Sequence, residues 1–331
     1  MDRNNALRTI ISFKKSNFEI SHADSILTFG SCFSENIGEK LANNKFNTDI
    51  NPFGVIFNPA SIFKSIESLL HKRVFLENDL FFNQDKWSSY SHHSRFGDLD
   101  KNACLQTINQ RINTSHENLI HSQFLILTFG TAWVYELKST GEIVANCHKM
   151  PASMFQRYLL SECDITEMYS SLLKELWKVN PNLQVIFTIS PVRHLKDGLE
   201  ANFLSKSVLR MAIFRLMESF SQLHYFPSYE ILLDDLRDYR FYSDDLCHPS
   251  SFAIDYIWQC FSEKYFSPET MELNKEINSI KEACRHRIFN PQSTNAKKFL
   301  EQTLVKIQNL ETRYPSLDFQ EEKKHLQKTL P

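Results

Sequence analysis

The spacing of apolar residues divides most of the chain into short strands and amphipathic helices. Short apolar runs predict five buried strands, at residues 25–29, 46–50, 124–129, 184–189 and 223–226. Between most of them, apolar residues recur three or four positions apart, as in Phe33/Ile37/Leu41, Ile62/Ile66/Leu69 and Met168/Leu172/Leu173/Leu176. Strands that alternate with helices predict an α/β fold, with a mainly parallel five-stranded sheet that is covered on both faces.

Two segments interrupt this alternation. Residues 74–96 are rich in aromatic side chains and histidine, and residues 133–150 predict a hairpin that turns at 139–141. Ligands of parallel sheets bind beyond the carboxyl ends of the strands. We therefore expect both segments to wall a cleft at that edge.

Near residue 268 the pattern changes to charged, amphipathic helix. Before it, Pro249 and the serines at 250–251 predict a helix start, with Phe252, Tyr256 and Ile257 on the inner face of that helix. We expect a domain at 1–267 with insertions near 74–96 and 133–150, followed by a helical extension at 268–331. The extension is interpreted as packing on the main domain, with a partner-binding or oligomer role as the alternative, so the oligomeric state stays open.

Composition narrows the function classes. The 331 residues are 42% hydrophobic, and 37 basic against 39 acidic residues give a net charge of −2, so neither nucleic acid nor a membrane surface is an expected partner. No apolar run approaches the roughly 20 residues that span a bilayer, and residues 1–15 lack the pattern of a signal peptide. Seven cysteines without CxxC spacing favour a reducing compartment, and we expect a cytoplasmic protein.

Ser31 stands where the first predicted strand ends and a helix begins. Its hydroxyl would be exposed there and its N–H would lie near the positive end of the helix dipole. The position suits a nucleophile, although a helix cap would occupy the same place. Three of the seven glycines, Gly30, Gly54 and Gly130, also follow apolar runs, which favours a shared site over separate turns.

Asp245 and His248 are the candidate partners of Ser31. A carboxylate three residues before a histidine can share one turn with it and hydrogen-bond one imidazole nitrogen, leaving the other for a serine. Such a pair is a weak signal alone, but the chain order Ser31, Asp245, His248 is that of a serine hydrolase with its nucleophile on the first strand. The chain has no Gly-x-Ser-x-Gly motif, which would indicate the other common α/β arrangement.

Six motifs occur in a specific order along residues 25–265. They are GSCFSENIG at 30–38, NPFG at 51–54, GTAW at 130–133, NCHK at 146–149, SPVRH at 190–194 and DLCHP at 245–249. Together they resemble the GSCFA family, which is related to the SGNH (GDSL-like) hydrolases. The resemblance implies a three-layer α/β/α sandwich of SGNH/flavodoxin-like type, with Ser31 as nucleophile, His248 as base and Asp245 as its orienter.

The resemblance also implies an oxyanion hole. Its donors would be the N–H of Ser31, the N–H of Gly54 and an asparagine side chain after the third strand, but Ala132 stands in the asparagine's place. Losing one such donor costs roughly 2.7 to 4 kcal/mol of transition-state stabilisation. Three groups are candidates for the missing donor: Thr131, Asn58 and Asn146.

The candidates for substrate binding are His92, His93, Trp133, Asn146, His148, Arg193 and His194. Each has a structural alternative, such as a hydrogen-bonded loop histidine, a hairpin end that packs on the core, or a surface ion pair. Arg193 is the candidate to bind a substrate oxygen or carboxylate through paired donors. A thiol nucleophile at Cys147 is less favoured, because no carboxylate has a useful local spacing from His148.

Metal and nucleotide chemistry are not expected. The histidines at 92, 93, 148 and 248 have no i, i+4 spacing, and neither HExxH, CxxC, GxGxxG nor a P-loop pattern occurs. The sequence predicts no metal and no cofactor.

The preferred function is a serine hydrolase of SGNH type that cleaves an ester through a Ser31 acyl-enzyme. Esters are favoured because His248 need not protonate a poor amine leaving group. An O-acetyl or other short acyl group on a carbohydrate is the expected substrate, since Trp87, Tyr90 and Trp133 suit stacking on a sugar. The alternative is a non-catalytic carbohydrate or small-ligand binding module on the same fold.

Overall fold

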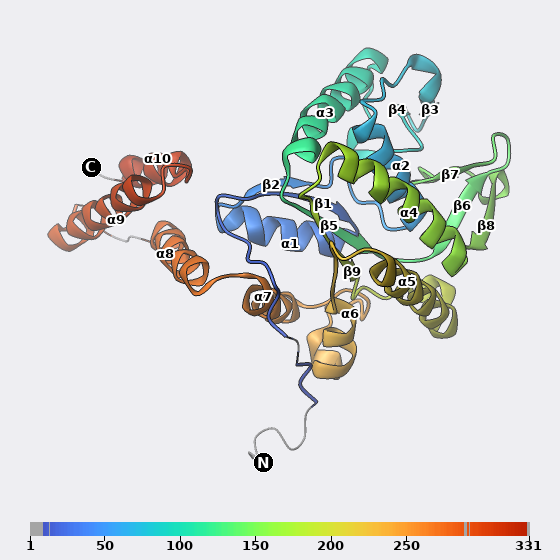
Figure 1. Cartoon of the computed structure of the whole chain (residues 1–331). Helices are drawn as coiled ribbons and strands as arrows, with labels where there is room; N and C mark the ends of the chain where they lie inside the picture. The colour runs from blue at the N-terminus through green and yellow to red at the C-terminus, as the bar shows by residue number, and fades with distance from the viewer. Residues whose placement is uncertain (1–8, 13, 288–289, 291, 330–331) are drawn as a thin grey trace. The chain divides into compact units, whose positions relative to one another are not determined.

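The computed structural model describes residues 9–12, 14–287, 290 and 292–329; its elements are labelled in Figure 1. Residues 1–8 and 13, part of the stretch in which no signal peptide is expected, lie outside this description. The chain divides into two units, and the first comprises mainly residues 25–39 and 48–260. The second takes in residues 14–24, 40–47 and 261–331. The boundary expected at 267/268 stays a prediction.

The first unit is built on a five-stranded sheet. Its strands are β1 (Ser25–Gly30), β2 (Asn47–Ile50), β5 (Phe124–Phe129), β9 (Gln184–Ile189) and β10 (Leu223–Phe226). The order across the sheet is β10-β9-β5-β1-β2. β1 pairs in parallel with β5, β5 with β9 and β9 with β10. All five predicted strands are present, within one residue at their ends.

The helices of this unit begin where the sequence supplies capping groups. They are α1 (Cys32–Asn43), α2 (Pro59–Leu70), α3 (Lys101–His121), α4 (Glu162–Val179), α5 (Leu199–Ser219), the short α6 (Ser228–Glu230) and α7 (Ser251–Tyr265). Asn58, Asp100 and Ser161 cap α2, α3 and α4 by accepting a backbone N–H. The alternation of strands and helices predicted from the sequence is therefore confirmed.

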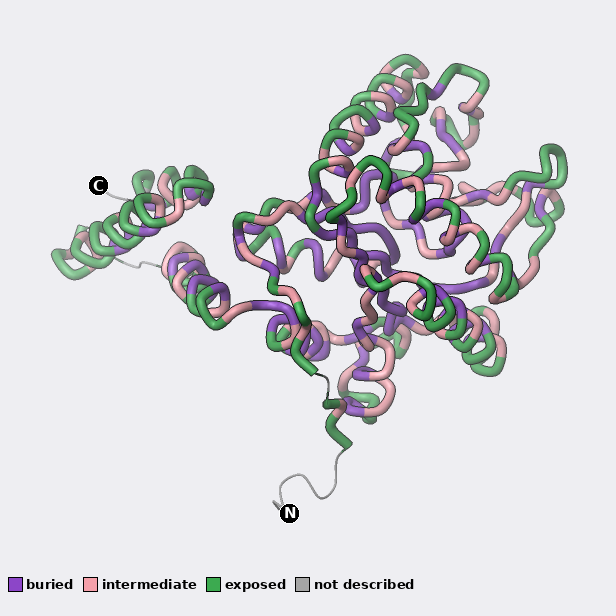
Figure 2. The backbone as a smooth tube through the Cα atoms, viewed as in Figure 1, coloured by how far each residue is buried: buried purple, intermediate pink, exposed green. Residues whose placement is uncertain are grey.

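Helices lie on both faces of the sheet. Leu27 and Phe29 of β1 pack in one apolar cluster with residues of α2, α3, α4 and α5. Side chains alternate along a strand, so Ile26 faces the other side; there, a Cβ at Gly38 of α1 would lie 2.8 Å from Ile50 Cγ2 of β2. Figure 2 shows the buried positions concentrated in the strands and along the helices. The expected three-layer α/β/α arrangement is confirmed.

One detail of the predicted packing is wrong. Phe252 was expected on the inner face of α7 but is 63% exposed, whereas Ala253 and Ile257 are fully buried. Ile257 is buried as predicted, and with Ala253 and Cys260 it forms an inner face of residues three or four apart that does not include Phe252.

The two insertions form small antiparallel sheets. In the first, β3 (Phe81–Asn83) pairs with β4 (Lys86–Ser88). In the second, β6 (Trp133–Leu137) pairs with β7 (Glu142–Val144), and Gly141 takes the turn with a φ of 71°. The predicted hairpin is confirmed, but β8 (Phe155–Leu159), which pairs along the other edge of β6, was not anticipated.

The second unit has an apolar core of its own. α8 (Pro268–Arg285), α9 (Thr294–Arg313) and α10 (Gln320–Thr329) bring together Leu273, Ile277, Ile280, Leu300, Ile307, Leu310 and Leu326. The predicted amphipathic faces thus pack against one another. In the described part of the chain, no helix has both the length and the hydropathy to cross a bilayer.

Candidate active site

Ser31 lies at the carboxyl end of β1, immediately before α1. Its hydroxyl donates to Ser190 Oγ at 3.0 Å and accepts the N–H of Phe33 at 3.2 Å, and the residue is 4% exposed. The preceding residue must be glycine, because a Cβ at Gly30 would lie 2.4 Å from Thr128 O. The Ser31 N–H donates to no acceptor among the described residues, so it is available to a ligand at the N-terminus of α1.

Asp245 and His248 form a tight local pair. One carboxylate oxygen of Asp245 accepts the N–H groups of Cys247 and His248 at 2.9 and 3.0 Å, and the other lies 2.6 Å from His248 Nδ1. These contacts, the backbone N–H of His248 first, lower the pKa of Asp245 to about 2. The imidazole is about half exposed. Its Nε2 has no hydrogen bond to any residue that the structure describes.

The pair lies in a loop. The spacing of three residues predicts that the two share one turn, and local hydrogen bonds bring them together. Ser243 N–H donates to His248 O at 2.8 Å, and Leu246 takes a φ of 56°. This backbone path brings the carboxylate back onto the imidazole three residues later. Local hydrogen bonds therefore fix which ring nitrogen faces outward.

Arg193 holds this loop against the end of β9. Its N–H donates to Cys247 O at 3.1 Å, and its guanidinium carbon lies 3.8 Å from the ring centroid of Tyr242. The side chain also lines a separate cavity of about 200 Å³ with Leu232 and Leu236. The stacking covers a face of the guanidinium and does not engage its N–H donors, so Arg193 positions the loop and its binding of a substrate oxygen stays a prediction.

His194 lies beside Gly130 at the end of β5. A Cβ on Gly130 would lie 3.4 Å from His194 Nε2. Burial, the ammonium of Lys206 and then the charge of His248 lower the pKa of His194 to about 4. A neutral imidazole therefore stands within the electrostatic reach of His248, which keeps His194 among the candidates for substrate binding.

The structure brings several candidates to one edge of the sheet. Ser31 follows β1 and Ser190 follows β9. The loop with Asp245 and His248 is bound to Arg193, three residues after Ser190. No hydrogen bond joins Ser31 to His248 within the described ranges, since the serine hydroxyl donates to Ser190. Catalytic hydrogen bonds are often long before substrate binds, so the triad stays a prediction.

The segment after β2 crosses the ends of β1 and β5. Ile56 N–H donates to Gly30 O at 3.0 Å, and Phe57 O accepts Gly130 N–H at 2.7 Å. Gly54 takes a φ of 81° in this segment, and a Cβ there would lie 2.3 Å from His93 Cβ. Gly54 thus serves a turn against which the first insertion packs.

Most of the predicted oxyanion donors are engaged within the protein. Gly54 N–H donates to Asn51 O at 2.7 Å, and Thr131 N–H to Phe57 O at 3.2 Å, with Thr131 Oγ1 3.0 Å from Ser205 Oγ. Their engagement opposes the predicted role of Gly54 and Thr131, because an N–H in such a bond is not free to meet an oxyanion.

The asparagine candidates also have structural roles. Asn58 caps α2 by accepting Ser61 N–H at 2.8 Å while its amide nitrogen donates to Ser61 Oγ. Asn146 accepts His148 N–H at 2.8 Å. Among the proposed donors, the Ser31 N–H and the side-chain amide nitrogen of Asn146 have no acceptor in the described chain.

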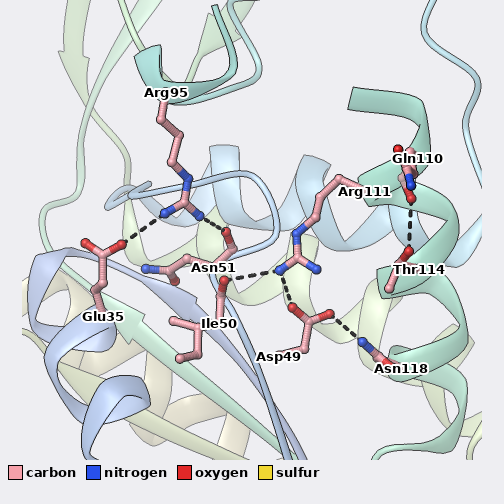
Figure 3. Close-up of polar contacts among 9 residues, drawn as sticks. All are labelled: Glu35, Asp49, Ile50, Asn51, Arg95, Gln110, Arg111, Thr114 and Asn118. Atoms are coloured by element: carbon pink, nitrogen blue, oxygen red, sulfur yellow. Dashed lines mark hydrogen bonds and ion pairs between the residues drawn. The ribbon is translucent and has the colours of Figure 1, made fainter. Parts of the chain in front are cut away.

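Asn51 is a residue that the sequence reasoning missed. It is fully buried with a φ of 43°, and neither atom of its side-chain amide has a hydrogen-bond partner among the described residues. Its carbonyl accepts Arg95 Nη2 at 2.6 Å, while Arg95 Nη1 donates to Glu35 of α1 at 3.0 Å (Figure 3). The available signals were its place directly after the second predicted strand and at the start of the NPFG motif.

A second polar cluster fixes the same strand. Arg111 of α3 forms an ion pair with Asp49, and Asn118 donates to the other carboxylate oxygen at 2.8 Å (Figure 3). These contacts tie β2 to α3 and so hold the start of the segment that reaches Gly54.

His92 is enclosed. It is 1% exposed, its ring is stacked on Phe53 with centroids 4.6 Å apart, and Phe75 and Phe96 contact other sides. Burial lowers the pKa of His92 to about 3, and Nδ1 has no partner in the described residues. A ring so enclosed cannot touch substrate without rearrangement, so we assign His92 a packing role.

The other insertion candidates join the two insertions. His148 Nε2 lies 2.9 Å from Ser89 O and 3.1 Å from His92 O. His93 Nδ1 accepts Arg95 N–H at 3.3 Å. These contacts, like the Asn146 contact with His148, give both histidines structural partners.

Trp133 is also engaged on one side. The guanidinium carbon of Arg157 lies 4.3 Å from its ring centroid, and its indole N–H donates to Ala201 O at 3.4 Å. The indole is therefore oriented by α5 and β8. Within the described ranges, no three histidine, cysteine or carboxylate side chains gather in a manner that could hold a metal ion.

The fold and the edge residues define an α/β protein with a serine and a carboxylate-bound histidine beyond the ends of a parallel sheet. The chain belongs to the GSCFA family, whose model matches residues 25–261. A second model, the C-terminal domain of GSCFA domain proteins, matches residues 277–331. The family expected from the ordered motifs is thus confirmed.

Other comparisons give distant similarity only. No curated protein matches the chain. A Streptococcus pneumonia structure, described as a candidate platelet activating factor, is 10% identical with a TM-score of 0.37, over 72% of this chain and 83% of that one. A Clostridium thermocellum family 3 carbohydrate esterase is 13% identical with a TM-score of 0.31, over 76% and 97%. We draw no argument about activity from either.

Proposed function

We propose that this protein is a serine hydrolase of SGNH type that cleaves an ester at Ser31. The observation that carries the proposal is the 2.6 Å contact of His248 Nδ1 with Asp245, which leaves Nε2 directed away from the carboxylate. A histidine held in this way has the tautomer that a general base requires. Ser31 lies at the sheet edge to which the same loop is bound.

The reaction starts when the Ser31 side chain turns from Ser190 toward His248. The hydroxyl proton passes to Nε2 while Oγ bonds to the acyl carbon, and the carbonyl oxygen becomes an oxyanion beside the Ser31 N–H. Collapse of this intermediate breaks the ester bond, and the alcohol leaves with the proton from His248. Water then releases the acid from the acyl-enzyme by the same base.

A short acyl group on a carbohydrate is the proposed substrate. A cavity of about 390 Å³ lies between α2 and both insertions, lined among others by Phe53, Tyr90 and Glu142. Mixed aromatic and polar linings of this size suit a sugar. The cavity reaches Phe53, which directly precedes Gly54, so the alcohol part of an ester could occupy it. Localisation in the cytoplasm stays part of this proposal.

The test compares wild type with Ser31→Ala on p-nitrophenyl acetate, p-nitrophenyl butyrate and acetylated monosaccharides. Release of nitrophenol and acetate should fall to the uncatalysed background in Ser31→Ala. Ser207→Ala is the matched control, because Ser207 is an exposed α5 serine whose hydroxyl donates to Phe203 O. Equal rates for wild type and Ser31→Ala would overturn the proposal.

A binding module without catalysis is the second candidate. It is favoured by the Ser31 hydroxyl, which is buried and donates to Ser190, and by the occupied N–H of Gly54. Calorimetry with acetylated monosaccharides separates the two. Binding of equal strength in wild type and Ser31→Ala, with no turnover in either, would favour the binding module.

A further inference from the structure

Lys206 of α5 is a fully buried cation at the same sheet edge. Its ammonium donates to Gly130 O and to Ser190 O, each at 2.7 Å. The residue is 2% exposed, and it forms no ion pair with a carboxylate in the described parts of the chain. A lysine is rarely buried without a counter-charge, because desolvating the ammonium is costly. Two backbone carbonyls are the acceptors that hold it.

These contacts connect three neighbouring strand ends. Gly130 follows β5 and Ser190 follows β9, so Lys206 ties two adjacent strands together. Ser190 Oγ in turn accepts the Ser31 hydroxyl at the end of β1, the next strand across the sheet. Only one residue stands between the ammonium and the proposed nucleophile.

α5 holds the neighbouring backbone as well. Ser205 Oγ accepts Ala132 N–H at 2.7 Å, and Asn202 Oδ1 accepts His194 N–H at 3.0 Å. Ser205 and Lys206 therefore fix the Gly130 to Ala132 segment, where the resemblance to SGNH hydrolases would place an oxyanion asparagine. Because Ala132 cannot donate through its side chain, another group must stabilise the oxyanion at this place.

The charge of Lys206 reaches the residues around Ser31. It lowers the pKa of the His194 imidazole and opposes the rise in pKa that burial gives the thiol of Cys32, the residue after Ser31. The ring centroid of Tyr229 in α6 lies 5.3 Å from Nζ. β5 and β9 carry no charged side chains. The ammonium is therefore stabilised at these strand ends by the carbonyl oxygens of Gly130 and Ser190 alone, within the described residues.

One further charged pair lies near by. Arg210, one turn further along α5, is 3.8 Å from Glu230. That pair is separate from Lys206, whose charge acts on the pKa of the Cys32 thiol and of the His194 imidazole.

We propose that Lys206 is a positioning residue for the reaction at Ser31: its ammonium fixes the ends of β5 and β9 and supplies positive charge close to the developing oxyanion. This inference rests on the proposed function. Positive charge at this edge stabilises the alkoxide and the tetrahedral intermediate, as the missing asparagine donor would do. It acts through the Gly130 and Ser190 carbonyls and does not touch the substrate.

Burial lowers the pKa of Lys206 to about 7. The ammonium therefore loses its charge as the pH rises through neutrality, while an amine can still donate to both carbonyls. Charge and geometry can be separated on this basis. If the charge contributes, acylation of Ser31 declines on the alkaline side of pH 7.

The experiment measures p-nitrophenyl acetate hydrolysis and Ser31 labelling by a fluorophosphonate between pH 5.5 and pH 9. The proteins are full-length wild type, Lys206→Met, Lys206→Arg and Ser31→Ala. At pH 6.5, Lys206→Met should lose about 100-fold in kcat/KM, the size expected for one lost oxyanion donor, and should lack the alkaline decline. In Lys206→Arg the guanidinium stays charged up to pH 9. This variant should therefore show no decline in activity above pH 7 and keep more activity than Lys206→Met.

Lys174→Met is the matched control, since Lys174 is an exposed lysine of α4. If Lys206→Met does not fold by circular dichroism, the wild-type profile alone decides. A wild-type rate that climbs to a plateau above pH 8 overturns the proposal, as does a Lys206→Met profile of wild-type shape that is merely lower. Failure of the proposed function is different: wild type and Ser31→Ala would then be equally inert.

Discussion

Two histidines, both predicted to serve the site, lie in opposite environments. His248 is about half exposed and bonded to Asp245, in a loop attached to the end of β9. His92 is 1% exposed, stacked on Phe53, and its Nδ1 has no partner in the described residues. A histidine in an aromatic segment can thus be enclosed by the rings around it. One with a carboxylate three residues away can instead be oriented for proton transfer.

The physical cause is desolvation. An imidazole enclosed by aromatic rings cannot accept a proton without placing a charge among them, so the pKa of His92 falls to about 3. The His248 loop instead supplies a carboxylate that compensates a positive ring. The same side chain is therefore apolar filler in one region and a candidate base in the other.

The largest effect is expected from His248→Ala. Removing the base should lower kcat/KM on p-nitrophenyl acetate by about 10⁴-fold, as for other triad members. His71→Ala is the matched control, because His71 is also exposed and lies 3.4 Å from Glu175. The comparison fails if both variants keep full activity.

Asp245→Asn should give the next largest loss. The neutral amide no longer selects the ring tautomer, so kcat should fall about 10²- to 10⁴-fold with little change in KM. Because the pKa of Asp245 is about 2, its carboxylate stays ionised from pH 4 to pH 9. A kcat of Asp245→Asn equal to that of wild type between pH 4 and pH 9 would contradict this role.

The stability arising from Asp245 has a defined pH window. Its folded pKa lies below the ordinary 3.8, so the contribution is present above about pH 4 and lost as the pH falls toward 2. Acid unfolding followed by circular dichroism should show a smaller difference between wild type and Asp245→Asn at pH 2 than at pH 5.

Gly54→Ala tests the join between the first insertion and the sheet edge. Left-handed φ and a Cβ 2.3 Å from His93 Cβ should together lower the free energy of unfolding by about 3 kcal/mol. Gly141→Ala is the control, with a φ of 71° but nothing within 4 Å of the added Cβ. It should cost only about 1 to 2 kcal/mol. Equal losses in the free energy of unfolding by urea for the two variants would contradict the proposed contact with His93.

His92→Phe should have the smallest effect on activity and a clear effect on the pH dependence of stability. With a folded pKa near 3 against 6.5 unfolded, wild type loses stability as the pH falls from 6.5 toward 3, by about 1.4 kcal/mol for each unit. His92→Phe should lose this dependence and keep wild-type turnover at pH 7.5. Urea midpoints at pH 4, 5 and 6.5 provide the measurement, and a parallel slope in both proteins would contradict the packing role.

Sequence reasoning was strongest where the pattern is local. The five strands, the hairpin turn at Gly141 and the C-terminal helices all follow from periodicity and turn residues, and the ordered motifs identified the family. It was weakest for side-chain direction. Phe252 is predicted on the buried face of α7 but is 63% exposed.

Three polar residues escaped the reasoning because their partners are distant in sequence. Ser190 and Asn51 begin two of the quoted motifs and Lys206 lies in none. The contacts of Ser190 and Lys206 exist only because residues 159 and 76 positions apart are brought together. Burial of an amide or an ammonium is likewise invisible until the helices that cover it are in place.

The sequence alone specifies the strands, the helices and their layering, because apolar periodicity indicates which faces must be buried. It also determined the Asp245 and His248 pair, since the two are three residues apart. Which groups remain available depends on the tertiary structure. The N–H of Gly54 is engaged in a turn and that of Thr131 by Phe57 O, His92 is enclosed, and Lys206 is buried between two strand ends. Hydrogen bonding and desolvation depend on what surrounds a group, and that is fixed by packing between elements far apart along the chain.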